Sequence, residues 1–321
     1  MPTDFKPPFL QINGHLQTIY PSIFRKVIVP YQRERISLED GDFLDLDWVK
    51  NGSKKLLIAT HGLEGDSNRH YVTGMVEKFI QNGFDGLGWN SRSCSGEINR
   101  LPRFYHHGDA GDLKFVIEYA MSLGYEEIFM AGFSMGGSLT LRLLGEYGAD
   151  VPPQIKGAVV VSVPLDLPSS VAELDKPGKR FYMNRFLKKL GKKLEQKARM
   201  FPENKLLSVE NYWTEVKNFE VFDNRYTAPL HGYENAQDFY KKASSKPLLK
   251  DIYVPALIVQ SINDPFLSPE CLDINGAENN KNIHLKLTQN GGHVGFMVKG
   301  QKHSLVEEMG WEFYSKLSQL T

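Results

Sequence analysis

Short apolar runs alternate with helical patterns through the first half of the chain. Strands are predicted at residues 55–62, 84–90, 126–134 and 157–167, and helices at 71–83, 109–124 and 138–148. Continuous, β-branched strands that alternate with amphipathic helices are typical of a parallel sheet covered by helices on both faces. Ahead of them, residues 26–52 are expected to form antiparallel strands with a turn near Gly41.

The alternation stops between about Pro168 and Pro255, where helix formers and aromatic residues dominate and no strand of comparable quality occurs. It then resumes with predicted strands at 256–264 and 282–289 and a final amphipathic helix at 303–317. We therefore predict an α/β core, a mainly helical cap inserted into it, and a cap position over the carboxyl ends of the strands, where α/β sheets bind ligands. The predicted boundaries are 1–167 and 251–321 for the core and 168–250 for the cap.

Composition narrows the class of protein. The 321 residues include 38 Lys+Arg and 38 Asp+Glu, and this balance gives no electrostatic case for a nucleic-acid partner. Cys94 and Cys271 are too few for a disulfide framework. We find no signal-peptide pattern and no apolar run of the roughly 18 residues that a membrane span needs, so a cytoplasmic location is expected.

The stretch AGFSMGGSLT, residues 131–140, places Ser134 between a predicted strand and a predicted helix. A lone G-x-S-x-G can arise by chance in a chain with 28 glycines. The predicted elements on either side must therefore decide whether Ser134 is a nucleophile. Strand, turn and helix in this order favour a nucleophile elbow, in which a serine takes a strained backbone conformation. Gly132 and Gly136 supply the small residues that such a turn needs two positions before and after the serine.

A nucleophilic serine needs a base at the same end of the sheet. Among nine histidines, His293 has the right position, because it follows the strand at 282–289 and precedes the last helix. Asp264 falls just past the strand residues ALIVQ, 256–260, in an Asn-Asp-Pro turn and is the preferred acid, with Asp166 as its rival at a neighbouring strand end. The order Ser134, Asp264, His293 is that of α/β-hydrolase triads.

Acyl transfer also needs hydrogen-bond donors that stabilise the negative charge that develops on the carbonyl oxygen. The backbone N–H groups of Leu63, after the first core strand, and of Met135, at a helix N-terminus, are the predicted oxyanion hole. His61 is interpreted as a residue that braces this loop and not as a second base.

Three longer stretches resemble one branch of a known superfamily: NGHLQT at 13–18, WNSRSCSGEINRLPRFYHHGD at 89–109 and FDNRYTAPLHGYENAQDFYKKAS at 222–244. They are similar to the YheT-like branch of the α/β-hydrolases, which is related to eukaryotic abhydrolase-domain lipases and esterases. The resemblance implies an α/β-hydrolase fold, a triad of Ser134, Asp264 and His293, an oxyanion loop at 61–63, and carboxylic-ester hydrolysis. One departure is Ser93, which stands where the family pattern has glycine, so the local shape of that loop is open.

Other chemistry-bearing residues have simpler interpretations. His106 and His107 lack partner ligands at metal-binding spacing, so we expect a loop before a capped helix and no metal. Cys94 is interpreted as a small loop thiol. Residues 176–199 hold ten Lys/Arg and one acid, with an apolar stripe at helical spacing. We favour a solvated helix face that covers the site; contact with an anionic membrane surface is the alternative.

The sequence thus predicts a serine carboxylic-ester hydrolase that acts on a small-molecule ester or lipid without a cofactor. Three alternatives remain open at this point. The same triad serves acyltransferases, and it also serves peptidases and carbon–carbon bond hydrolases, since fold does not dictate function. A catalytically silent binding protein on the same scaffold is the third.

Overall fold

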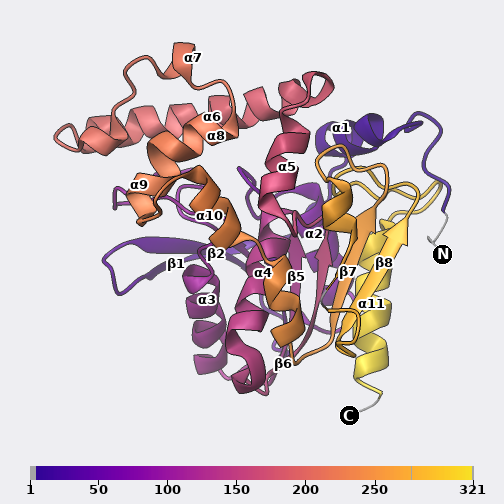
Figure 1. Ribbon diagram of the computed structural model, residues 1–321. Helices are drawn as coiled ribbons and strands as arrows, with labels where there is room; N and C mark the ends of the chain where they lie inside the picture. The colour runs from indigo at the N-terminus through magenta and orange to yellow at the C-terminus, as the bar shows by residue number, and fades with distance from the viewer. Residues whose placement is uncertain (1–4, 276, 320–321) are drawn as a thin grey trace.

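The computed structural model describes residues 5–275 and 277–319. Its centre is an eight-stranded sheet in the order β1-β2-β4-β3-β5-β6-β7-β8 (Figure 1). The strands are β1 (Gln32–Ser37), β2 (Phe43–Val49), β3 (Lys55–Thr60), β4 (Asp85–Asn90), β5 (Glu127–Phe133), β6 (Ile155–Val161), β7 (Ala256–Ser261) and β8 (Ile283–Thr288). β2 pairs antiparallel with β1 and β4, and all later pairs are parallel. The predicted α/β architecture with a mostly parallel sheet is confirmed.

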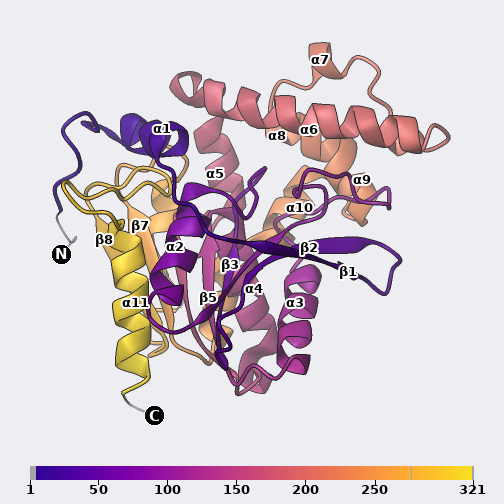
Figure 2. The ribbon, with the colours of Figure 1, turned by 180° about the vertical axis from the view of Figure 1, so that it is seen from behind.

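Helices cover both faces of the sheet (Figures 1 and 2). In β3, Leu56 and Ile58 pack in the same apolar cluster as α3 (Gly111–Ser122) and α4 (Met135–Tyr147). Leu57 and Ala59 pack on the opposite face, in the cluster that contains α2 (His70–Ile80) and α11 (Leu305–Leu317). Successive strand residues point to opposite faces, so a strand buried on both sides is apolar at every position. This is why the core strands are continuous apolar runs in the sequence.

Several elements differ from their predicted bounds at the edge of the sheet that carries the site; the strand predicted at 256–264, for example, ends at Ser261. α4 begins at Met135, three residues before the predicted start, because the chain turns directly from strand into helix at Ser134. β6 ends at Val161, and Ser162 has a left-handed backbone with φ 53° that turns the chain out of the sheet. The residues expected to extend this strand lead instead into α5 (Leu167–Leu174).

Between β6 and β7, a segment that the structure describes throughout, the chain forms helices and turns but no strand. The long helix α6 (Arg180–Met200) lies across one end of the sheet, with the short helices α7 (Tyr212–Glu215) and α8 (Phe219–Phe222) beside it (Figure 1). α9 (Ala228–His231) and α10 (Ala236–Ala243) follow. The last turn, η5 (Lys246–Asp251), packs against α4, so this end of the insertion lies on the core.

A buried arginine ties the β1–β2 hairpin to the loop after β4. The Arg92 guanidinium donates to Asp42 at 2.9 Å and to Asp112 at 2.8 Å, and it forms an ion pair with Asp40 at 2.8 Å. The Arg92 side chain is only 3% exposed, and that of Asp42 is fully buried. The charges are therefore stable inside the protein only as a group.

Ser93 takes the left-handed conformation, with φ 63°, that glycine adopts more easily. Its hydroxyl donates to Asn99 Oδ1 at 2.5 Å and accepts from the Asn99 N–H at 3.1 Å. These two hydrogen bonds hold the strained backbone in place, so the loop keeps a glycine-like turn although a serine occupies it.

Replacing Arg92 with methionine is expected to lower the free energy of unfolding by about 3–5 kcal/mol, because Asp42 and Asp112 would stay buried without a cation. Urea denaturation measures the loss. The control is Lys114→Met, which removes an exposed ion pair to Glu118 at 3.8 Å and should cost less than about 1 kcal/mol. Equal unfolding midpoints for the two variants would contradict the importance of the buried cluster.

Candidate active site

Three predicted site residues lie just beyond the carboxyl ends of parallel strands. Ser134 follows β5 directly, Asp264 lies three residues after β7, and His293 lies five residues after β8. β5 to β8 are consecutive in the sheet, so these loops emerge at one edge. The edge brings together side chains that are up to 159 residues apart in the chain.

The three side chains form an unbroken hydrogen-bonded series. His293 Nε2 lies 2.9 Å from Ser134 Oγ, and His293 Nδ1 lies 2.9 Å and 3.2 Å from the two Asp264 carboxylate oxygens. Asp264 and His293 are buried, and the Phe266 ring stacks on the imidazole at 4.0 Å between ring centroids. This geometry allows a proton to pass from the serine to an imidazole whose orientation the carboxylate fixes. The rival acid, Asp166, instead caps α5 by accepting from the Ser169 N–H at 3.0 Å.

Ser134 has a left-handed backbone, with φ 53° and ψ −120°, which is strained for a residue with a side chain. The neighbouring backbone comes so close that side chains are excluded on both sides. A Cβ on Gly132 would lie 2.5 Å from the Gly136 carbonyl oxygen, and a Cβ on Gly136 would lie 2.3 Å from the Thr60 carbonyl oxygen. Both positions therefore require glycine because a Cβ atom would clash with backbone oxygen atoms, although neither glycine has a positive φ.

The predicted oxyanion donors lie on either side of this serine. A Cβ on Gly62 would lie 3.1 Å from Ser134 Cβ, so the 61–63 loop runs directly past the nucleophile candidate. Met135 is the first residue of α4, and its N–H has no intrahelical acceptor. Within the described residues, neither Leu63 N–H nor Met135 N–H donates a hydrogen bond. Both are free to bind an oxygen atom.

His61 uses both ring nitrogens inside the protein. Nδ1 donates to the Gly62 carbonyl oxygen at 2.7 Å, and Nε2 accepts from the Ser91 N–H at 3.1 Å. Burial lowers the pKa of His61 to about 4, so the ring is neutral near pH 7. Its hydrogen bonds join the loops after β3 and β4 and leave no nitrogen for a substrate.

Residues 13–18, to which the sequence alone assigns no role, form the N-cap and the start of helix α1 (Gly14–Phe24). The buried Gln17 side-chain oxygen accepts from Asn263 Nδ2 at 3.0 Å and from the Gly291 N–H at 2.7 Å. Thr18 Oγ1 accepts from the His293 N–H at 2.8 Å. α1 thus fixes the loops that carry Asp264 and His293. Only the resemblance of this stretch to a family motif signalled its importance.

Two spaces meet at Ser134, and both are lined by Leu63, Phe186, Phe266 and His293. The first, of about 930 Å³, is mainly apolar. It extends between α5, α6, α8 and α10 and is lined by Leu167, Val171, Leu174, Leu190, Phe219, Phe222 and Phe239, among others. The second, of about 1270 Å³, opens between α1, α6 and the 62–71 segment and carries several basic side chains.

One buried acid also lines the apolar pocket. Asp223 accepts from the Thr227 hydroxyl at 2.5 Å and from the Tyr240 hydroxyl at 2.7 Å. Burial raises the pKa of Asp223 to about 6. The pocket wall therefore holds a polar point within a largely apolar lining.

The chain shares its sequence pattern and its fold with known proteins. Residues 55–300 match the family model described as the alpha/beta hydrolase fold. The chain belongs to the α/β-hydrolase family. Within it, the chain is 34% identical to YheT of Escherichia coli K12 over 298 residues, covering 89% of this chain and 84% of that protein. It is 31% identical to human phospholipase ABHD3, covering 89% and 71%. The predicted YheT-like branch is confirmed.

A more distant relative of this α/β-hydrolase is the monoacylglycerol lipase of Saccharomyces cerevisiae, 27% identical over 338 residues, with 89% and 75% of the two chains covered. Among solved structures, the Pyrococcus furiosus esterase Pf2001 superposes with a TM-score of 0.59 at 18% identity, covering 90% of each chain, which supports the fold. The family membership and the curated relatives together make the chain a hydrolase of the esterase and lipase type.

Other candidate residues of the hydrolase have structural partners. His106 packs against His231 with ring centroids 4.2 Å apart, and among the described residues no group of three or more His, Cys, Asp or Glu is placed to hold a metal ion. Cys94 is buried, which raises the pKa of its thiol and disfavours the reactive thiolate. No helix in the described ranges has the length and apolar character to cross a membrane.

The basic run at 176–199 lies mostly in α6, and several of its cations are directed into the protein. Lys193 pairs with Glu64 at 2.7 Å, and Lys197 is fully buried and donates to the Asn99 carbonyl oxygen at 2.8 Å. Lys176 and Lys179 pair with Glu173. The run therefore covers the site with a partly neutralised surface, and membrane contact through it stays an untested hypothesis.

Gly136→Ala is expected to lower the free energy of unfolding by about 1–3 kcal/mol, because the new methyl group meets backbone atoms that cannot move aside cheaply. Urea denaturation checks this value. Gly178→Ala is the control, since nothing lies within 4 Å of a Cβ at that position and its backbone φ is ordinary. A Gly136→Ala protein as stable as the control would show that the elbow has more room than its geometry indicates.

Proposed function

We propose that the chain hydrolyses carboxylic esters through Ser134, His293 and Asp264 by way of an acyl-enzyme intermediate. The observation that carries the proposal is the hydrogen-bonded series from Ser134 Oγ through the imidazole to the Asp264 carboxylate, at the point where an apolar pocket meets an open groove. An ester bound there would have its acyl chain in the pocket and its alcohol portion in the groove.

In the first half of the reaction, His293 Nε2 takes the proton of the Ser134 hydroxyl while Oγ bonds to the ester carbonyl carbon. The negative charge on the carbonyl oxygen is held by the N–H groups of Leu63 and Met135, the latter at the positive end of the α4 dipole. The bond to the alcohol oxygen then breaks, and the alcohol leaves with the proton from His293.

In the second half, a water molecule gives a proton to His293 and its oxygen bonds to the acyl carbon. The bond to Ser134 Oγ breaks, the serine recovers its proton, and the carboxylic acid is released. Asp264 keeps the imidazole in the tautomer that presents Nε2 to the serine. Phe266 keeps the ring in its plane by stacking on it. No metal ion or organic cofactor takes part in this scheme.

The substrate proposed is a small to medium acyl ester or a lipid. The apolar lining of the pocket supports this choice, since such pockets bind mainly by burying hydrocarbon. Two relatives are named phospholipase and monoacylglycerol lipase, which agrees with a lipid-like ester. The cytoplasmic location predicted from the sequence stays a prediction.

Ser134→Ala is expected to reduce kcat/KM for p-nitrophenyl esters by a factor of about 10³ or more, because the acyl-enzyme cannot form. The assay uses acetate through palmitate, and the chain length with the highest kcat/KM measures the depth of the pocket. A fluorophosphonate probe should label the wild type and leave the variant unlabelled.

The matched control is Ser122→Ala, which removes an exposed hydroxyl that bonds only the Tyr119 carbonyl oxygen. It should keep both activity and labelling. If Ser134→Ala stayed active, or if folded wild type neither reacted with the probe nor hydrolysed any ester, the serine mechanism would be wrong.

A further inference from the structure

The groove on the alcohol side of Ser134 is rich in positive charge. It is lined by Arg25, Lys26, Arg69, Arg185 and Lys189, together with Ser134 and His293. One of these cations is already neutralised, because Arg25 forms two hydrogen bonds with the Glu307 carboxylate at 2.6 and 2.8 Å. Of the other four, Arg69, Arg185 and Lys189 are considered next.

Two of them converge on a single neutral atom. Lys189 Nζ and Arg69 Nη2 both donate to the carbonyl oxygen of Glu64, at 2.9 and 3.0 Å. The Glu64 carboxylate lies elsewhere, where it pairs with Lys193 at 2.7 Å and accepts from the Tyr105 hydroxyl at 2.7 Å. The left-handed backbone of Glu64, with φ 54°, allows its carbonyl and its side chain to serve different partners. The carbonyl orders the two cations but does not cancel their charge.

Little other negative charge reaches them. Arg69 forms an ion pair with Asp66 at 3.6 Å, but this distance is too long for a hydrogen bond, and the buried Nε of Arg69 has no hydrogen-bond partner among the described residues. Arg185 forms no ion pair or hydrogen bond with any residue in the described ranges. Burial and the positive charges of Arg69 and Arg185 lower the pKa of Lys189, and the Glu64 carboxylate only partly opposes this effect. One carboxylate at 3.6 Å does not balance three neighbouring cations, so the group keeps a net positive charge that an anionic ligand would neutralise.

α6 separates this charge from the apolar pocket by its own periodicity. Arg185 and Lys189 are four residues apart and line only the groove, Leu190 lines only the pocket, and Phe186 lies between them and lines both. Residues at i and i+4 share a helix face, so neighbouring stripes of one helix serve the two halves of the site. An ester placed at Ser134 would meet hydrocarbon on one side and cations on the other.

We propose that the groove binds a phosphate group on the alcohol portion of the ester, with Arg69, Arg185 and Lys189 as its ligands. This inference rests on the proposed function and deepens it, by making the substrate an acyl ester of a phosphorylated alcohol. A guanidinium presents several N–H donors in a plane and an ammonium adds a point charge, and together they suit the several oxygens of a phosphate.

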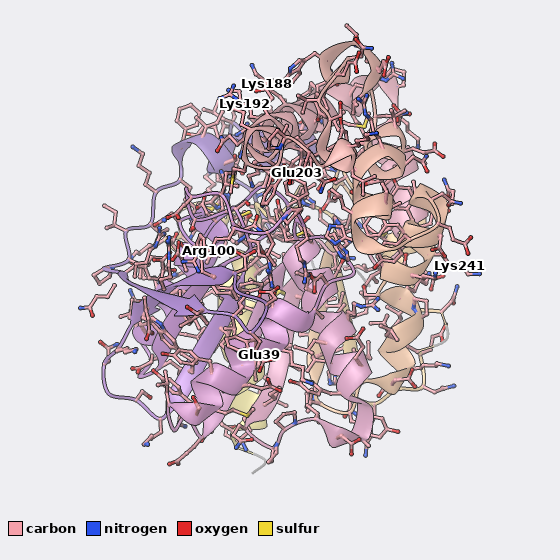
Figure 3. All side chains as sticks on the ribbon, turned by 90° about the vertical axis from the view of Figure 1, so that its left-hand side faces the viewer. Glu39, Arg100, Lys188, Lys192, Glu203 and Lys241 are labelled. Atoms are coloured by element: carbon pink, nitrogen blue, oxygen red, sulfur yellow. The ribbon has the colours of Figure 1, made fainter. Side chains whose placement is uncertain are left out.

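The test compares two esters that share one acyl chain, 1-octanoylglycerol and 1-octanoylglycerol 3-phosphate, at concentrations where both are monomeric. The wild type should show a kcat/KM at least about tenfold higher for the phosphate ester, and Arg185→Gln should lower this preference by about tenfold. Lys188→Gln and Lys192→Gln are matched controls, because each removes one positive charge from an exposed position on α6 (Figure 3) and neither residue lines the groove. They should keep the wild-type preference. Equal kcat/KM values for the two esters would overturn the inference.

A binding measurement separates this inference from the hydrolytic mechanism. Ser134→Ala protein is titrated calorimetrically with octanoylglycerol 3-phosphate, glycerol 3-phosphate and inorganic phosphate. The acylated ligand should bind most tightly, and adding Arg185→Gln should weaken its binding by about tenfold. If the wild type hydrolysed neither ester while this binding result held, the proposed function would fail and the phosphate site would stand. If inorganic phosphate bound as tightly as the acylated ligand without competing with it, the groove would be a separate anion site and the inference would be wrong.

Discussion

Ser134 holds its backbone in the left-handed region, a conformation that costs a residue with a side chain roughly 1–2 kcal/mol. Ser134 keeps this strained conformation because β5 and α4 meet with no intervening loop. Backbone atoms also pack against both elbow glycines at distances that leave no room for a methyl group. The rest of the site is arranged around this fixed point. The 61–63 loop passes against it, α4 begins from it, and His293 reaches it from a strand three places along the sheet.

Local sequence patterns predicted those parts of the arrangement that depend on residues close together in the chain. Apolar runs and turn residues located the strands, and the strand ends located Ser134, Asp264 and His293. The choice between Asp264 and Asp166 could be made only in part from the sequence, since both follow strands. In the structure, Asp166 caps the first turn of α5, whereas the Asp264 carboxylate is hydrogen-bonded to the His293 imidazole.

Other features could not be predicted, because they depend on partners far away in the chain. Nothing near Arg92 in the sequence indicates that it is buried among carboxylates from the β1–β2 hairpin and from α3. The left-handed backbone of Ser93 could not be predicted either. Glycine adopts this conformation easily, whereas Ser93 is held in it by its hydrogen bonds to Asn99. In the basic run at 176–199, periodicity predicted the apolar stripe, but only the fold shows which cations are held by the protein and which line the groove.

The hydrogen bonds of Gln17 join the start of the chain to loops 246 and 274 residues further on. Contacts between residues so far apart in the sequence close large loops of the chain. Closing such loops costs conformational entropy, so we expect these contacts to form late in folding. During synthesis, α1 emerges well before the loops that it contacts, because most of the sheet lies between Gln17 and those loops in the chain. The strands up to β6 can therefore pair while Asp264 and His293 are still without this support. Under the proposed mechanism, this order keeps the nascent chain inactive until the loops after β7 and β8 have been synthesised.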